Sequence, residues 1–430
     1  MTFSKAIPLS AAVLLLLFFP SCTVKVEPLM PTPILFQELE FGPLDHIPDD
    51  DRWNLRRVYY ATTRARNSNL QRIDYINEES AEISVGMAMI GFGGHQMTWD
   101  DLNEVSRQGQ REETVPLSIT GLFEAGNYTI NEEGSIRQTQ GAASWLFSNI
   151  DSAVQTARDK DILIFVHGAK VNFYNACAFA AQLDHFMGRD MTSIAFSWPT
   201  RQNIFAYAVG DDANRAYRSA NALVSLVESL ASETSARRIH ILTWSAGGRL
   251  VTAALDQLRK RHADMSAEEL RETYRLGTVY YAAADVPRNE FIAALPGIND
   301  LVDRVVVTAS SNDEALKSAQ FIMRGSLRIG QLGHNLEGEQ LDIVLNADRL
   351  EFIDMSRGRD ERGFDITGHR YWFNHPWAST DMLLSIRSDL EPEQRGLEPT
   401  EVSILWWMPE DYPQRLRNLV KLEENGGLRR

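Results

Sequence analysis

The sequence has few cysteines, fewer basic than acidic side chains and only short apolar runs, and each shortage excludes a class of protein. Two cysteines in 430 residues, Cys22 and Cys177, rule out a disulfide framework and a cysteine-rich zinc site. The formal charge of -15 argues against a nucleic-acid partner, whose binding needs clustered lysine and arginine. With 44% hydrophobic and 23% charged residues, the chain has the composition of a globular protein with a large core.

An apolar run at residues 11–19 follows Lys5 and is too short to span a membrane. It has the length of the apolar part of a signal peptide. The run leads into the Phe-Pro-Ser-Cys of residues 19–22, which resembles a bacterial lipobox, where the cysteine is lipidated and becomes the new N-terminus. We therefore predict a lipoprotein-type signal peptide over residues 1–22, with a lipid anchor on Cys22.

Phe19 and Pro20 differ from the usual leucine and small residue of a lipobox, so a plain secretory signal cut nearby is the alternative. Thr23 follows the cysteine, and the absence of aspartate there usually directs Gram-negative lipoproteins to the outer membrane. The expected location is the bacterial cell envelope, on an outer-membrane anchor that faces the periplasm. The alternative location is a soluble periplasmic or secreted one.

Composition suggests the domain boundaries. Residues 23–55 are rich in proline, which disfavours helices and strand ladders, so an extended tether is expected there. The globular domain is predicted over residues 56–395, with N-terminal strands and loops at 56–140 and an αβ core at 141–395. Residues 396–430 are expected to form a tail that packs on this domain.

Apolar runs of strand length alternate with helical patterns from residue 141 onward. This alternation predicts the α/β class, with a mostly parallel, doubly wound sheet that carries helices on both faces. Residues 91–134 are turn-rich and remain unassigned. Strands are expected at residues 58–62, 83–89, 162–166, 193–198, 239–244, 276–284, 305–309, 341–345 and 350–353, and the clearest helices at 142–157, 211–231 and 379–386.

Ser245 lies where the apolar run 239–244 ends and a helical pattern begins. A serine at such a sharp strand-to-helix turn is lifted clear of the backbone at the positive end of the helix, as in the nucleophile elbow G-x-S-x-G. Thr243 replaces the first glycine of that motif, and Gly247 supplies the second. The motif favours a nucleophile, and the alternative is an ordinary turn of serine and glycine.

A serine nucleophile needs a histidine base and a carboxylate that orients it. In α/β hydrolases these follow in the order Ser, Asp or Glu, His. His369 is the preferred base because it follows the last predicted strands in a Thr-Gly-His loop. His334 precedes those strands, and His375, directly before a proline, is expected to be structural.

Two aspartates at strand ends are candidates for the acid. Asp313 follows the second predicted strand after Ser245, where this fold usually places the acid, and Asp285 follows the first. Asp313 is preferred and Asp285 is the alternative. Either side chain could instead cap the N-terminus of a helix.

An oxyanion hole needs two backbone N–H donors beside the nucleophile. The sequence offers the N–H of Ala246, directly after Ser245, and the N–H of Ala169 at the end of an earlier strand. Gly168 allows a sharp turn before Ala169. His167 is expected to support this loop by hydrogen bonding.

A set of short motifs in chain order resembles a group of bacterial α/β hydrolases of uncharacterised function in the esterase/lipase superfamily. The resemblance covers roughly residues 56–387 and implies an α/β-hydrolase fold with Ser245, Asp313 and His369 as the triad. The motifs are Val58-Tyr-Tyr-Ala-Thr-Thr-Arg, Phe165-Val-His-Gly, Phe196-Ser-Trp-Pro, Tyr207 with Asp211 or Asp212, Trp244-Ser-Ala-Gly, Ala284-Asp-Val, Ser310-Ser-Asn-Asp-Glu-Ala-Leu and Gly368-His-Arg-Tyr.

The chain departs from the family pattern beside the nucleophile. Trp244 and Ala246 replace the usual histidine and methionine on either side of the serine, and Ala169-Lys170 replaces Tyr-Asn after His-Gly. The serine, glycine and histidine positions remain, so these departures do not exclude catalysis. The altered neighbours indicate a different substrate pocket.

The favoured hypothesis is a serine hydrolase that cleaves a carboxylic ester, or a lipid or thioester, through an acyl-enzyme. Neither a metal nor a cofactor is implied, and the expected partner is a small-molecule or lipid ester. The alternative is a catalytically silent α/β-hydrolase domain that serves as an envelope binding or assembly module. A third, weaker hypothesis is acyl transfer by the same triad.

Overall fold

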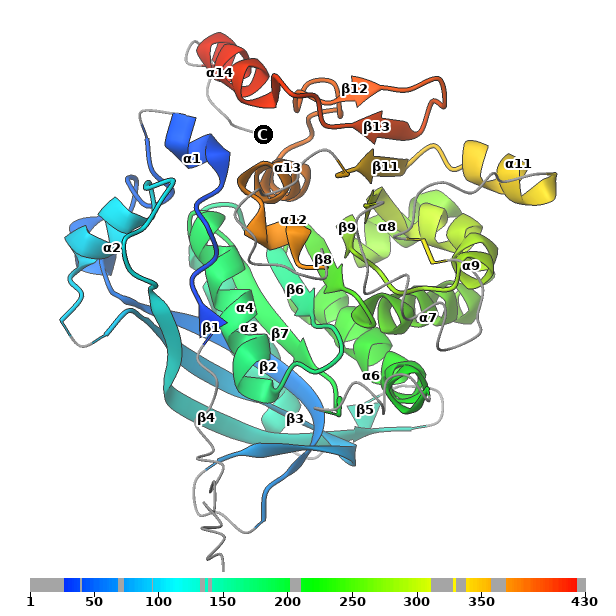
Figure 1. Ribbon diagram of the computed structural model, residues 1–430. Coiled ribbons are helices and arrows are strands. Elements are labelled where there is room, and N and C mark those ends of the chain that lie inside the picture. The colour runs from blue at the N-terminus through cyan, green and yellow to red at the C-terminus, as the bar shows by residue number, and fades with distance from the viewer. Residues whose placement is uncertain are drawn as a thin grey trace, which may run out of the picture.

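One mixed sheet extends through the computed structural model (Figure 1). The structure describes residues 27–38, 41–68, 73–94, 96–131, 136–137, 141–201, 210–310, 328–329, 338–356 and 369–423. The sheet has 13 strands in the order β1-β4-β3-β2-β7-β6-β8-β9-β10-β11-β13-β12, and β5 pairs with β4. The strands are β1 Glu27–Pro28, β2 Leu55–Arg66, β3 Tyr75–Phe92, β4 Pro116–Ile130, β5 Ile136–Arg137, β6 Ile162–Val166, β7 Thr192–Ser197, β8 Ile239–Trp244, β9 Leu276–Ala282, β10 Val302–Ala309, β11 Leu350–Asp354, β12 Glu398–Pro399 and β13 Leu405–Trp407.

The strands from β2 to β13 in this order are all parallel, and antiparallel strands lie at both ends. This arrangement confirms the predicted α/β class with a mostly parallel sheet. The helices are α1 Ile34–Glu38, α2 Trp99–Val105, α3 Ala142–Thr156, α4 Phe173–Phe186, α6 Asp211–Glu233, α7 Gly247–Arg261, α8 Ala267–Tyr274, α9 Arg288–Leu301, α11 Glu339–Leu345, α12 Tyr371–Asn374, α13 Pro376–Arg387 and α14 Tyr412–Glu423.

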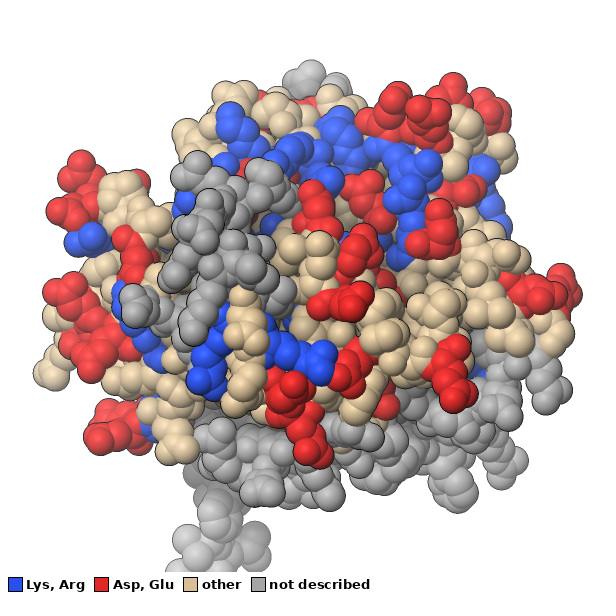
Figure 2. Space-filling view, turned by 90° about the horizontal axis from the view of Figure 1, so that it is seen from above, with Lys and Arg blue, Asp and Glu red and all other residues tan. Residues whose placement is uncertain are grey.

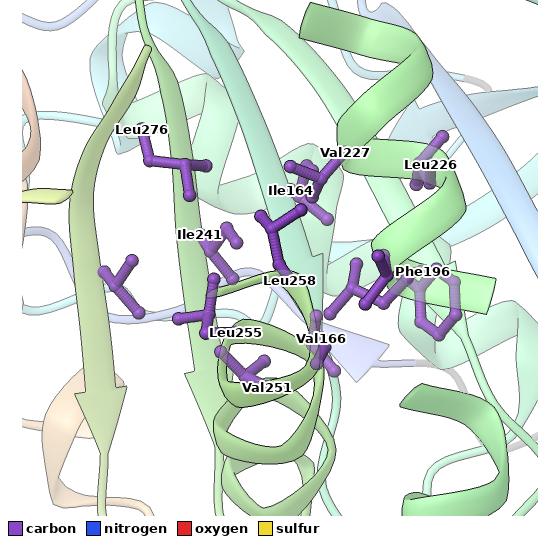
Figure 3. Packing of buried hydrophobic residues seen from close by; sticks show 14 of the residues in the cluster. Ile164, Val166, Phe196, Leu226, Val227, Ile241, Val251, Leu255, Leu258 and Leu276 are labelled. Atoms are coloured by element: carbon purple, nitrogen blue, oxygen red, sulfur yellow. The ribbon is translucent and has the colours of Figure 1, made fainter. Parts of the chain in front are cut away.

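Both faces of the sheet are buried, which explains the uninterrupted apolar runs of the central strands. In β6, Ile164 and Val166 face one core while Leu163 and Phe165 face the other, because successive side chains of a strand alternate. Helices α3, α6, α7, α8 and α9 cover the first face, and α1, α4, α12, α13 and α14 the second. Figure 3 shows side chains of α6 and α7 packed on strand residues of the first face. Burial of each aliphatic side chain in these cores stabilises the folded state by roughly 1.5–3 kcal/mol relative to an exposed side chain.

The chain changes direction across the sheet at β6, which has β7 on one side and β8 on the other. In the β6–β8 ladder Val166 pairs with Thr243, so the two strands end level with one another. The loops after β6 and β8 therefore begin side by side. A switch of this kind, outside the carboxyl ends of parallel strands, is where α/β sheets bind ligands.

The predicted tether is wrong for the described part of residues 23–55, which packs on the domain. The side chains of Leu29, Met30 and Phe36 are buried in the second core. The Met30 N–H donates to Gln182 Oε1 at 2.7 Å, and β1 pairs with β4 and forms the end of the sheet. Proline removes a backbone donor, but an extended proline-rich chain can still bury its apolar side chains.

The C-terminal segment continues the sheet. Strand β13 is parallel to β11, and Leu397, Met408, Tyr412 and Leu416 are buried against the second core. Figure 1 shows α14 beside α1, so the C-terminal and N-terminal segments of the described chain cover the same side of the domain.

One short segment differs from its predicted structure, and one unassigned segment proves to have regular structure. Residues 341–345 were predicted as a strand, but they belong to helix α11, whose buried Val344 faces the first core. Leu341, Val344 and Leu345 are spaced as on a helix, and so short a run does not distinguish helix from strand. The unassigned residues 91–134 contain α2 and β4, and β4 extends the sheet antiparallel to β3.

Charged side chains are mixed on the face seen in Figure 2, where acidic and basic groups lie next to one another. In the described ranges, each helix is too short or too polar to cross a lipid bilayer.

Candidate active site

Ser245 lies at the turn between β8 and α7 and has a left-handed backbone, with φ of +53°. A left-handed conformation is uncommon for a residue with a Cβ and costs on the order of 1 kcal/mol. Three hydrogen bonds fix the turn. The Ser245 N–H donates to the Ala282 carbonyl at 3.1 Å, and the Ser245 carbonyl accepts from the N–H groups of Gly248 and Asp285, each at 3.0 Å. The strained geometry of a nucleophile elbow is thus supported by the neighbouring strand β9.

Two glycines let the backbone approach Ser245 closely. A Cβ on Gly168 would lie 2.9 Å from the Ser245 Cβ, so the loop after β6 runs directly beside the serine. A Cβ on Gly247 would lie 2.6 Å from the His167 carbonyl oxygen and 2.8 Å from the Thr243 hydroxyl oxygen. Thr243 therefore takes the first glycine position of the motif only because Gly247 leaves room for it.

His369 lies beside the serine although 124 residues separate them in the chain. Its Nε2 is 2.8 Å from the Ser245 Oγ, so the hydroxyl can donate to the imidazole. His369 lies between β11 and α12, and its ring packs on Trp244 with centroids 5.8 Å apart. Ser245 is 8% exposed, and His369 is half-buried.

The other two histidine candidates have different positions. His375 caps α13, where its Nδ1 accepts from the Trp377 N–H at 3.2 Å, a structural role. His334 lies outside the described residues.

Asp285 is fully buried and is engaged by two guanidinium groups. Arg249 Nη2 lies 3.3 Å from its Oδ2, and Arg328 pairs with its Oδ1. Asp313 lies outside the described residues. Strand β10, which leads toward it, ends at Ala309 beside β11, the strand that precedes His369.

The loop after β6 has a fixed peptide orientation. The Gly168 carbonyl accepts from His167 Nδ1 at 2.8 Å, and a carbonyl can only accept, so Nδ1 carries the proton. In a trans peptide the N–H points opposite to the C=O. The Ala169 N–H is therefore directed away from the His167 ring. Ala246, the other proposed donor, is buried at the N-terminus of α7, whose dipole favours negative charge.

Arg64 fixes the tautomer of His167, a role that the sequence interpretation missed. The buried guanidinium donates to His167 Nε2 at 3.5 Å, to the Val171 carbonyl at 2.6 Å and to Ser197 Oγ at 2.9 Å. Burial, and secondarily the Arg64 charge, lowers the pKa of His167 to about 3, so the ring is neutral at pH 7. The available signal was an arginine two residues after the predicted strand 58–62.

Aromatic side chains from three elements surround His369 and the turn. Trp244 packs against Phe179, Trp372 and Phe373, with ring centroids 5.7–6.3 Å apart. The guanidinium carbon of Arg370 lies 4.8–5.7 Å from the ring centroids of Phe373, Phe179 and Trp244. Its Nη2 pairs with Glu27 Oε1 at 2.5 Å. Sequence reasoning did not identify this cluster, because its members are brought together only by the fold.

The described ranges contain no group of three or more His, Cys, Asp or Glu side chains placed to hold a metal ion. Cys177 is buried in α4, and burial raises the pKa of its thiol.

The parallel sheet, the strained serine after β8 and the histidine after β11 define the α/β-hydrolase class. Residues 143–384 match the family described as alpha/beta hydrolase of unknown function (DUF900), and the chain belongs to this family. The match confirms the family resemblance recognised from the motifs.

No curated protein matches the chain significantly. Among solved structures, the chain is similar to the acylaminoacyl peptidase of Pyrococcus horikoshii, with 9% sequence identity and a TM-score of 0.25. This match covers 63% of the chain and 52% of the peptidase, so the chain spans about half the length of that protein.

Proposed function

We propose that the protein is a serine hydrolase that cleaves a carboxylic ester through an acyl-enzyme. The observation that carries the proposal is the 2.8 Å separation of Ser245 Oγ and His369 Nε2 at a strained strand-to-helix turn. Oγ attacks the acyl carbon as Nε2 takes its proton, and the leaving alcohol then receives that proton. Water activated by His369 attacks the acyl-enzyme, which releases the acid and restores Ser245.

Asp313 is proposed as the acid that orients His369. It follows β10, the second strand after the nucleophile in chain order, and the carboxyl end of β10 lies beside that of β11. Asp285, the alternative, is already engaged by Arg249 and Arg328. Each carboxylate oxygen of Asp285 is thus paired with a guanidinium group, and this engagement favours Asp313 as the partner of His369.

The proposed oxyanion hole consists of the N–H groups of Ala246 and Ala169. Ala246 begins the turn of α7, and the loop that holds Ala169 contacts the serine at Gly168. The hydrogen bond from His167 to the Gly168 carbonyl supports this assignment, because it turns the next N–H away from the histidine. Each such donor contributes typically a hundredfold to a thousandfold in kcat, on the order of 3 kcal/mol.

The first test is labelling with a fluorophosphonate, which reacts with an activated serine. Protein that lacks residues 1–22 should form one adduct, located on Ser245 by peptide mass spectrometry. Ser245→Ala and His369→Ala should abolish it, and His375→Ala, which alters a histidine in a helix cap, should retain it. Absence of an adduct on folded protein would point to a silent binding module. Faster acyl-enzyme turnover with added alcohol would point to acyl transfer.

A further inference from the structure

The N-terminal segment contacts the candidate active site. Glu27, the first described residue, pairs through Oε1 with Arg370 Nη2 at 2.5 Å, and its side chain is 6% exposed. Arg370 directly follows His369, and its guanidinium lies over the ring of Trp244, the residue before Ser245. Glu27 is thus joined to the Ser245–His369 pair by a short series of contacts.

Glu27 is held firmly at this place. It pairs with Leu117 in the β1–β4 ladder, and Arg111 Nη1 donates to the carbonyls of Leu29 at 3.1 Å and Met30 at 2.8 Å. Because these bonds join the segment to β4 and to the loop before it, the chain cannot swing away from the domain without losing them. The position of Glu27 relative to Ser245 is therefore a fixed property of the fold.

Covalent geometry then limits how far the domain can lie from a lipid on Cys22. An extended chain spans at most about 3.6 Å per residue, so the five steps from Cys22 to Glu27 reach no farther than about 18 Å. A lipidated cysteine lies at the membrane surface. The contacts of Glu27 would consequently bring the serine site close to that surface.

We propose that lipidated Cys22 holds the Ser245 site against the bilayer, and that the substrate is an acyl ester of a membrane lipid. This inference rests on the proposed serine hydrolase function. The side chains of Trp244, Phe179 and Phe373 pack on one another beside the nucleophile and are buried, so the surroundings of Ser245 on this side are apolar. An acyl ester that passes directly from the bilayer to a serine held at its surface avoids exposure of its methylenes to water, a cost that rises with chain length.

The test compares forms of the protein that differ in how the domain is joined to the membrane. The native lipoprotein is compared with a form released from the membrane, which begins at residue 23. A third form carries about twenty Gly and Ser residues between Thr23 and Val24, enough to let the domain move tens of ångströms away. The matched control carries the same inserted residues after Arg430. Mass spectrometry of the N-terminal peptide verifies the lipid on Cys22.

Each form is assayed on two substrates. One is a fluorogenic long-chain diacyl phospholipid in vesicles of phosphatidylethanolamine and phosphatidylglycerol, and the other is the soluble ester p-nitrophenyl butyrate. We expect the native form and the C-terminal control to cleave the vesicle substrate on the order of tenfold or more faster than the released form. The spacer form should bind the vesicles yet lose most of that advantage, and all forms should cleave the soluble ester equally.

Equal vesicle activity of the native and spacer forms would overturn the inference, and so would a Cys22 without lipid. These results would leave the proposed function in place if the soluble ester is cleaved. Failure of every form on both substrates, together with no fluorophosphonate adduct, would instead remove the proposed function and this inference with it.

Discussion

At the residue scale, the site depends on a few backbone orientations that are costly or easily lost. Ser245 keeps a left-handed φ of +53° because three hydrogen bonds tie its turn to β9 and α7. The Gly168 carbonyl keeps its direction because His167 donates to it, and Arg64 keeps His167 in the required tautomer. The left-handed backbone of Ser245 has a cost in stability, as is common at functional sites.

The identity of the acid can be tested by paired substitutions. If Asp313 orients His369, Asp313→Asn should lower kcat on a soluble ester by about ten-thousandfold with little change in stability. Asp285→Asn should leave most activity but destabilise the fold, because Arg249 and Arg328 would lose their buried counter-charge. Ester kinetics and urea unfolding measure the two effects. The opposite result, activity lost only in Asp285→Asn, would assign the acid to Asp285.

His167 is proposed as a positioning residue. His167→Leu removes the donor to the Gly168 carbonyl, which frees the Gly168–Ala169 peptide to rotate and weakens the oxyanion hole. We expect kcat to fall by roughly tenfold to a hundredfold, less than for complete loss of a donor, with KM nearly unchanged. His167→Asn can donate from a similar position and should restore much of kcat. An equal loss in both variants, or a change confined to KM, would contradict this role.

At the element scale, an ion network fastens the C-terminal segment to the sheet. The guanidinium of Arg395 is fully buried, where Nε donates to Asp381 of α13 at 2.9 Å and Nη2 to Glu351 of β11 at 2.6 Å. Arg304 of β10 also pairs with Glu351 at 3.0 Å. The network joins helix α13 and strands β10 and β11 to the chain that leads into β12.

Removal of Arg395 should therefore destabilise the fold strongly. Arg395→Met leaves Asp381 without its cation in a buried environment, and we expect a loss of about 3–5 kcal/mol in the free energy of unfolding by urea. Arg415→Met is the matched control, because the Arg415 side chain is 34% exposed and its ion pairs should be worth at most about 1 kcal/mol. Equal losses in the two variants would show that the buried network is not specially stabilising.

At the scale of the whole molecule, buried neutral histidines make the fold sensitive to acid. Burial lowers the pKa of His167 to about 3 and that of His185 well below its usual 6.5, and nearby arginines lower both further. The unfolded chain then binds more protons than the folded one once the pH is below about 6.5. The stability associated with these groups is fully present above that pH and is lost as the pH falls toward the folded pKa values.

We therefore expect the free energy of unfolding to decrease by up to about 1.4 kcal/mol per pH unit for each of these histidines as the pH falls below about 6.5. Urea unfolding at a series of pH values from neutral to mildly acidic measures this slope. His185→Gln removes one titrating group. The slope of the free energy of unfolding against pH should therefore decrease by up to about 1.4 kcal/mol per pH unit. An unchanged slope in that variant would contradict the assignment to buried neutral histidine.

The alternation of apolar runs and helical patterns was sufficient to predict the α/β class and most central elements. The strand 162–166 and the helix at 211–231 reappear as β6 and α6, because a strand buried on both faces and a long amphipathic helix leave strong patterns. The prediction for a short segment was wrong, as at residues 341–345, where a helix replaces the expected strand. The prediction of a tether was wrong because local proline content does not determine whether an extended chain packs on the surface of the domain.

The sequence by itself determined the chemical groups of the site and the sharp turn that presents Ser245. A strand, small residues and a helix in direct succession are local properties, and local propensity decides them. Only the tertiary structure decided which of the later residues meet the serine. It placed His369 Nε2 at 2.8 Å from Ser245 Oγ and paired Asp285 with two arginines. It also brought Arg64, Arg370 and Glu27 to the site. Such contacts depend on the order of strands in the sheet and on packing between distant segments, which no local pattern encodes.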